Sequence, residues 1–261
     1  MSDWSIEIFQ NQFDSQTLSE KFSYSFPQRP SSFFESVIDS IDNVNSKLFL
    51  LVINGEVRGA TFGFKISGYD FDVWSPSYLY VDKEHRNISF LFILSTLKKM
   101  STNIIDVSPT EDVRKILRAL KYTDLSKGSF MIPSIIGVIK TFNKRMLTKC
   151  SSPIERFNKR DDLIWLKSMD GESFFCLKQT SRYGVPFFVL VYFDKRLIND
   201  FITDLLFIIL KINPLGILIL PNLGRAIGVT SLKSSKFYSL SSNSEFSNYY
   251  SILGSEVTEV I

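Results

Sequence analysis

The fold of this chain is decided by residues 79–100, which read LYVDKEHRNISFLFILSTLKKM. A β-rich run over 77–81 leads into a polar loop and then into a segment with apolar residues at helical spacing over 88–100. The order strand, loop, helix follows. The loop opens a helix, and the first backbone N–H groups of a helix have no partner within it. A ligand is therefore expected to bind at this end of the strand.

Upstream of this stretch, the pattern predicts a helix between two sets of strands. Residues 4–9 alternate as in a strand, and residues 31–44 have apolar positions at helical spacing. Two further strands, 48–53 and 56–65, flank Asn54-Gly55. This dipeptide favours the two positive φ angles of a type I′ turn, so these strands are predicted to form a hairpin.

Downstream, three further elements follow in the first half of the chain. Residues 103–107 are predicted as a strand, Ser108 as the N-cap of a helix over 112–120, and residues 122–132 as extended chain. In the second half we predict strands and one long helix in a comparable order, over residues 174–180, 186–193, 197–212 (the helix), 216–220, 236–240 and 249–261. The repeated order of elements predicts two related modules.

Composition excludes several classes of protein. Of 261 residues, 44% are hydrophobic and the net charge is only +3, which indicates a globular protein and gives no sign of nucleic-acid binding. Two cysteines without CxxC spacing and a single histidine make a metal site improbable, and both thiols are expected to be buried. The first residues lack the features of a secretory signal, which favours the cytoplasm.

The apolar run over 201–220 is about as long as a membrane span. Asp204 and Lys211 interrupt it, and the turn-forming residues 213–216 divide it. We predict a buried helix followed by a buried strand, and no span.

The segments 51–60, 79–86 and 116–122, read together, resemble the GNAT superfamily of acyl-CoA N-acyltransferases over residues 4–132. The whole chain resembles tandem-GNAT proteins that bacteria encode among polysaccharide-biosynthesis genes. The resemblance implies an α/β (α+β) fold of two GNAT-like modules, each a mixed, mostly antiparallel sheet flanked by helices. The expected domains are 1–140 and 163–261, a partial module, with a linker over 141–162.

The resemblance also implies a site for acetyl-CoA or another acyl-CoA. The family binds the pyrophosphate at a loop reading Arg or Gln, two residues, Gly, one residue, then Gly or Ala. Here that loop is Arg86-Asn87-Ile88-Ser89-Phe90-Leu91, so Ser89 and Leu91 depart from the pattern. The backbone near Leu79 and Val81 would hold the acyl carbonyl. Ser108 or Thr110 would contact the pantetheine arm, although Ser108 serves equally well as a helix cap.

A general base must reach the acceptor amine or hydroxyl. Candidates in and beside the loop are His85, Glu84 and Tyr80, and Asp82, Asp70 and Asp72 are further carboxylates within the region. A lone histidine in a charged loop is more often a solvated surface residue, and Tyr78 and Tyr80 are more often core residues. No metal is implied.

Two functions therefore remain open. The first is an acyltransferase that moves an acyl group from acyl-CoA to an amine or hydroxyl of a small-molecule acceptor. A sugar acceptor is implied only by the tandem-GNAT resemblance, and aminoacyl transfer as in Fem-type enzymes is a related alternative. The second is a degenerate GNAT-fold protein without catalysis that acts as a binding or scaffolding partner. Homo-oligomerisation is left open.

Overall fold

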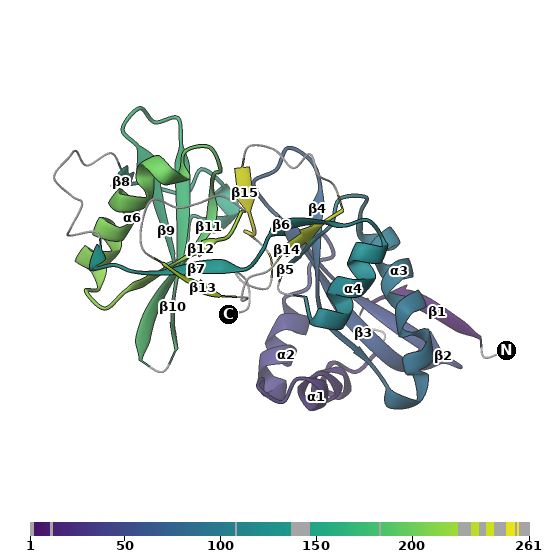
Figure 1. The fold of residues 1–261 in the computed structure, drawn as a ribbon. Helices are drawn as coiled ribbons and strands as arrows, with labels where there is room; N and C mark the ends of the chain where they lie inside the picture. The colour runs from purple at the N-terminus through teal and green to yellow at the C-terminus, as the bar shows by residue number, and fades with distance from the viewer. Residues whose placement is uncertain are drawn as a thin grey trace. The chain divides into compact units, whose positions relative to one another are not determined.

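The computed structural model describes residues 3–10, 13–107, 109–136, 147–182, 184–223, 231–234, 239–242, 249–253 and 255. The chain divides into two compact units (Figure 1). The first comprises Met1–Ile66, Phe71–Val107 and Gly254–Val260, and the second comprises Ser67–Asp70, Ser108–Leu253 and Ile261.

In the first unit, the described strands β1 (Trp4–Ile8), β2 (Ser46–Ile53), β3 (Glu56–Ile66) and β4 (Val73–Val81) form an antiparallel sheet in that order. Helices α1 (Ser15–Ser25) and α2 (Ser31–Asp39) lie on one face of it. The 3₁₀ helix η1 (Lys83–Ile88) and helix α3 (Ser89–Met100) follow β4, and β5 (Ile105–Val107) comes next.

Alternation along the strands builds the two faces of this sheet. Leu48, Leu50 and Phe62 are buried against α1 and α2, in a core that includes Phe22 and Phe34. Leu51 and Ile53 alternate with the residues of this core along β2. They are buried on the opposite face of the sheet, with Phe92 of α3. The strand, loop and helix predicted from residues 79–100 are confirmed.

The hairpin turn between β2 and β3 is also confirmed. Asn54 has φ 53° and Gly55 has φ 82°, as a type I′ turn requires. By contrast, helix α1 was not predicted. Its sequence signal is local: the Asp14 carboxylate caps it by accepting the Thr17 backbone N–H at 2.8 Å, and Leu18 and Phe22 lie one turn apart on its buried face.

The second unit is built on a sheet of eight described strands. The order is β13-β7-β12-β11-β10-β9-β8, and β15 also pairs with β11. Its strands are β7 (Ser129–Pro133), β8 (Leu147–Lys149), β9 (Leu163–Ser168), β10 (Phe174–Arg182), β11 (Val185–Asp194), β12 (Ile217–Pro221), β13 (Leu232–Ser234) and β15 (Tyr249–Ser251). Only the β11–β12 pair is parallel among the described pairs of this sheet.

The remaining described elements of the second unit are two α-helices, a 3₁₀ helix and two short strands. They are α4 (Glu111–Ala119), β6 (Thr123–Ser126), η2 (Glu155–Phe157), α6 (Ile198–Ile212) and β14 (Ser239–Ser241), which pairs with β6. Phe201 of α6 contacts Phe175 of β10, with ring centroids 5.1 Å apart. The prediction that residues 201–220 split into a helix and a strand is confirmed by α6 and β12. Within the described part of the chain, no helix combines the length and apolarity needed to cross a membrane.

Some predicted boundaries differ from the structure. The helix expected over 31–44 ends at Asp39, because Asp42 folds the chain back by accepting the N–H groups of Val44, Asn45 and Ser46. The cap of α4 was predicted wrongly. Thr110, not Ser108, is the N-cap, and its hydroxyl accepts the Val113 N–H at 3.4 Å. Ser108 itself lies outside the described residues.

The domain boundaries predicted at residues 140 and 163 stay a prediction, since residues 137–146 lie outside the described residues. One strand is informative here. β7, which the prediction assigned to the N-terminal domain, pairs with β12 and β13 of the second unit. The strands predicted over 236–240 and 249–261 lie partly outside the described residues and are seen as β14 and β15.

Candidate functional site

The carboxyl-terminal half of β4 has an irregular backbone. Ala60 pairs with Tyr80 and Phe62 pairs with Ser77, so Thr61 of β3 faces two residues of β4, Tyr78 and Leu79. This arrangement is a β-bulge. Tyr78 has φ 50°, a left-handed conformation that is uncommon for an aromatic residue. Such a backbone persists only where its surroundings hold it, and this is often at a functional site.

β4 also lies beside β5. A parallel bridge joins Trp74 of β4 to Ile104, the residue before β5. The Trp74 N–H donates to the main-chain oxygen of Asn103 at 3.0 Å. Among the described residues, no ladder between β4 and β5 continues past this bridge. On the side away from β3, the regular strand pairing of β4 among the described residues is therefore short.

The candidate residues of β4 lie on opposite faces of the sheet. Leu79 and Val81 pack with Ile88 beside Phe92 of α3. Tyr78 and Tyr80 lie on the side of α1 and α2, where Tyr78 contacts an aromatic group that includes Phe26 and Phe34.

Tyr80 is the most deeply buried of the candidate catalytic residues. Its side chain is 4% exposed, and its ring meets Phe22 edge to face at 4.8 Å. Its hydroxyl has no hydrogen-bond partner among the described residues. Burial, and then the charge of Asp82, raise the pKa of this phenol, so it is protonated at neutral pH. A buried hydroxyl without a partner is costly in free energy, which makes it a candidate contact for a bound ligand.

The loop after Val81 forms the 3₁₀ helix η1, which continues directly into α3. The His85 N–H donates to the main-chain oxygen of Asp82 at 2.8 Å. The Ser89 N–H donates to the Arg86 oxygen. These two N–H groups are thus used within the turn, and the second belongs to the first residue of α3, so an anion would have to meet the N–H groups that follow Ser89.

The side chains of this turn point largely to solvent. Glu84, Arg86 and Asn87 are exposed and His85 is half-buried. Phe90 is 45% exposed and Leu91 is 46% exposed. Leu91 therefore does not turn into the core, and its side chain stands on the surface of the first turn of α3.

Asp82 connects the start of the loop to two other elements. Its carboxylate lies 3.3 Å from the Lys21 Nζ of α1 and 3.6 Å from an Arg58 nitrogen of β3. The Lys21 Nζ also donates to the Val57 oxygen at 2.7 Å. These contacts fix the position at which the chain leaves β4. They also engage Asp82, which was one of the candidate bases.

Other candidates lie away from the loop or have structural contacts. Asp72 pairs with Lys65 at 2.6 Å, at the far end of β4 from Val81. Asp70 is exposed and belongs to the second unit. The Thr110 hydroxyl caps α4. Among the described residues, no group of three metal-ligating side chains is close enough to hold an ion.

The bulge and Thr61 were not identified from the sequence. Tyr78 is not a residue type that marks a positive φ, and no glycine accompanies it. The position of the bulge depends on how β3 and β4 pair.

The fold is shared with solved acetyltransferase structures. A GCN5-related N-acetyltransferase from Anabaena variabilis matches 92% of this chain and 73% of its own, at 11% identity and a TM-score of 0.59. One from Kribbella flavida matches 92% of this chain and 71% of its own, at 10% identity and a TM-score of 0.54. A conserved protein from Enterococcus faecalis V583 matches 92% and 72%, at 10% identity and a TM-score of 0.54. No family model and no curated protein matches the chain.

At these identities the likeness shows the fold alone, which is mixed α/β, with mostly antiparallel sheets flanked by helices in both units. The predicted fold class is confirmed.

Proposed function

We propose that this protein is an acyltransferase that moves an acetyl or other acyl group from acyl-CoA to an amine or hydroxyl of a small acceptor. The observation that supports it most directly is the irregular end of β4. The bulge at Tyr78 follows a pairing with the β5 side that is limited to the Trp74–Ile104 bridge, and β4 ends at the turn that starts α3. An extended thioester can lie along such a strand while its phosphates meet the helix N-terminus.

In this proposal the backbone of Leu79 and Val81 holds the acyl carbonyl. The segment from Arg86 to Leu91 receives the pyrophosphate, and Ser108 or Thr110 contacts the pantetheine arm. His85, Glu84 and Tyr80 are the candidates for proton transfer. Tyr80, being protonated and unpartnered, suits a proton donor rather than a base.

The acceptor belongs to the same proposal. A nucleotide sugar or polysaccharide precursor in the cytoplasm is the acceptor implied by the tandem-GNAT resemblance. Assays with amino-sugar and hydroxyl-sugar acceptors test this part separately from acyl-CoA binding.

Calorimetric titration of the full chain with acetyl-CoA tests the donor. We expect binding, and we expect Ser89→Glu to weaken it about tenfold, because a carboxylate beside the phosphates repels them. A glutamate in the first helical turn is otherwise favourable, so the variant should remain folded. Ser32→Glu, at an exposed serine in the first turn of α2, is the matched control and should bind as the original chain does. A folded chain that fails to bind at millimolar acetyl-CoA contradicts the proposal.

A second candidate, a GNAT-fold protein without catalysis, is favoured by one observation. Leu91 stands where the family has Gly or Ala, and its side chain is exposed at the start of α3, where phosphates would approach. If Leu91 blocks this approach, acetyl-CoA binds neither the original chain nor Ser32→Glu. Binding by Leu91→Ala alone would then identify the lost site.

A further inference from the structure

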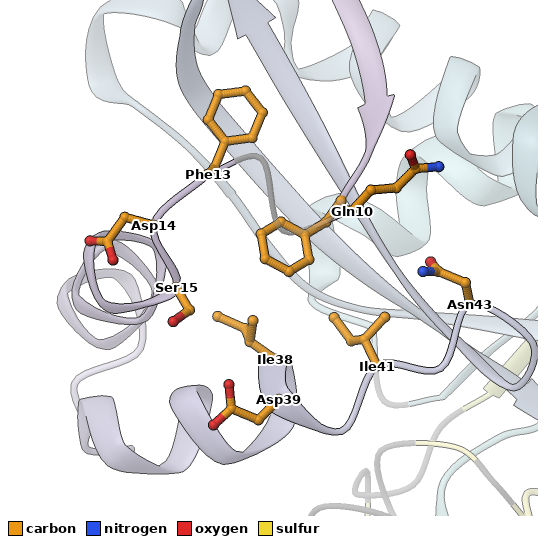
Figure 2. Close-up of a pocket in the computed structure, with 9 residues that line it drawn as sticks. Gln10, Phe13, Asp14, Ser15, Ile38, Asp39, Ile41 and Asn43 are labelled. Carbon is orange, nitrogen blue, oxygen red and sulfur yellow. The ribbon is translucent and has the colours of Figure 1, made fainter.

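A hollow lies in the first unit, on the side of the sheet covered by α1 and α2. Its volume is about 620 Å³, which is within the range of small-molecule sites. It opens where β1 ends, α1 begins and α2 ends (Figure 2). No residue named above for acyl transfer lines it.

The polar lining of this pocket is acidic at one side. Asp14 stands at the start of α1 and Asp39 is the last residue of α2 (Figure 2). None of the described residues that line the pocket is basic. A helix C-terminus adds partial negative charge beside Asp39. The pocket therefore favours a cation.

The two carboxylates differ in their engagement. The Thr17 backbone N–H and hydroxyl donate to the Asp14 Oδ2 at 2.8 and 2.6 Å. The hydrogen bond from the Thr17 side chain, and then that from its backbone, lower the pKa of Asp14, which is ionised at neutral pH. Asp39 is exposed and has no hydrogen-bond or ion-pair partner among the described residues. It is available to a ligand without breaking a structural contact.

The rest of the lining defines the shape of the cation. Phe9 and Ile38 are buried and form an apolar base, and Ile41 packs partly against it. The amides of Gln10 and Asn43 lie on the side away from the two carboxylates (Figure 2). Across the pocket, the lining changes from carboxylates, through apolar side chains, to amide groups. This lining is complementary to a ligand in which a short methylene chain joins an ammonium group to a second polar group.

We propose that this pocket binds a small aliphatic amine, with one ammonium group at Asp39 and its methylene chain over Phe9 and Ile41. The site is separate from the end of β4 proposed for acyl transfer. Ile8, beside Phe9, pairs with Phe49, and Phe49 pairs with Thr61, which faces the bulge of β4. Three strand spacings, roughly 14 Å, thus separate β1 from β4.

NMR titration of the full chain with cadaverine, a linear diamine, tests this site. We expect amide shifts concentrated at Phe9, Ser15 and Ile41, and no such shifts with pentanediol, its neutral counterpart. Asp39→Asn should weaken the affinity for cadaverine about fivefold, as expected for one partly solvated ion pair. Asp161→Asn removes the same charge from an exposed aspartate of the second unit and should leave the affinity unchanged.

A second variant tests the position without depending on Asp39. Ser15→Lys should supply an ammonium group from the chain itself and abolish binding while the protein stays folded. The proposal is overturned if cadaverine at tens of millimolar shifts no pocket amide, or if pentanediol produces the same shifts. It is equally overturned if Asp39→Asn and Asp161→Asn weaken the affinity for cadaverine by the same factor, since that result indicates a general charge effect.

Discussion

The hydroxyl of Thr61 donates a hydrogen bond of 2.9 Å to the main-chain oxygen of Ser77, the residue that precedes the left-handed Tyr78. Thr61 is buried and is the single residue of β3 that faces the bulge. The hydrogen bond therefore ties the irregular part of β4 to its neighbouring strand.

The first prediction concerns this hydrogen bond. Thr61→Val keeps the shape of the side chain but removes the donor, so we expect the first unit to lose about 1 kcal/mol of unfolding free energy. Acetyl-CoA affinity should fall with it, because the bulge is less well held. Thr61→Ser retains the hydroxyl and serves as the control. Urea unfolding and calorimetric titration provide the two measurements, and an equal loss in both variants would point to packing instead.

The second prediction concerns the start of α3. Leu91→Ala restores a small residue at a motif position, and we expect acetyl-CoA to bind about fivefold more tightly, which corresponds to about 1 kcal/mol. Phe90→Ala is a close control, because Phe90 is 45% exposed and Leu91 is 46% exposed while only Leu91 occupies the motif position. Equal gains in the two variants would argue against a specific steric effect.

The third prediction is a pH dependence at Asp42. Burial raises the pKa of this carboxyl, but hydrogen bonds from Asn45, Ser46 and Val44 outweigh it and hold the pKa well below its ordinary value of 3.8. A lowered pKa in the folded state stabilises the protein above the unfolded value, and this contribution is lost as the pH falls through the folded value. At pH 7 we expect Asp42→Ala to cost about 1 kcal/mol, since the site is partly solvated.

The difference between Asp42→Ala and the original chain should therefore shrink as the pH is lowered from neutral to below 3.8. Unfolding free energies at several pH values check this. Asp161→Ala, at an exposed aspartate, should show neither the loss nor its pH dependence. A constant difference across the range would mean that Asp42 acts through its shape and not through its charge.

The fourth prediction concerns a buried lysine of the second unit. Lys178 is 3% exposed, and its Nζ lies 3.4 Å from the Asp162 Oδ2. Arg160 also donates to Asp162, at 2.7 and 2.8 Å. Asp162→Ala weakens the compensation of a buried charge, and we expect a loss of about 2–3 kcal/mol. Lys178→Met leaves Asp162 with Arg160 and should cost only about 1 kcal/mol.

Hydrogen exchange of the β9 and β10 amides would measure both variants in the unit concerned. The test is which of the two substitutions, Asp162→Ala or Lys178→Met, destabilises the second unit more. If Lys178→Met is the more destabilising change, the lysine contributes mainly through packing of its methylene chain.

Some features of this protein follow from local sequence alone. Asn54-Gly55 specifies a hairpin turn because few other residues accept two consecutive positive φ angles. The spacing of apolar residues defines α3, and the turn after Asn213 divides α6 from β12. Each of these depends on residues close together in the chain. The motif from Arg86 to Leu91 was located in the same way, at the start of a helix.

Other features depend on which segments become neighbours. The bulge at Tyr78 exists because β4 pairs with β3 out of step by one residue, and the pairing on the other side of β4 is limited to a single bridge. β7 joins the sheet of the second unit through partners about ninety residues further along the chain. The pocket between Asp14 and Asp39 likewise forms only when α1 and α2 pack on the sheet. Strand pairing and packing are long-range, so the sequence located the candidate loop, and the tertiary structure decided the shape of the site.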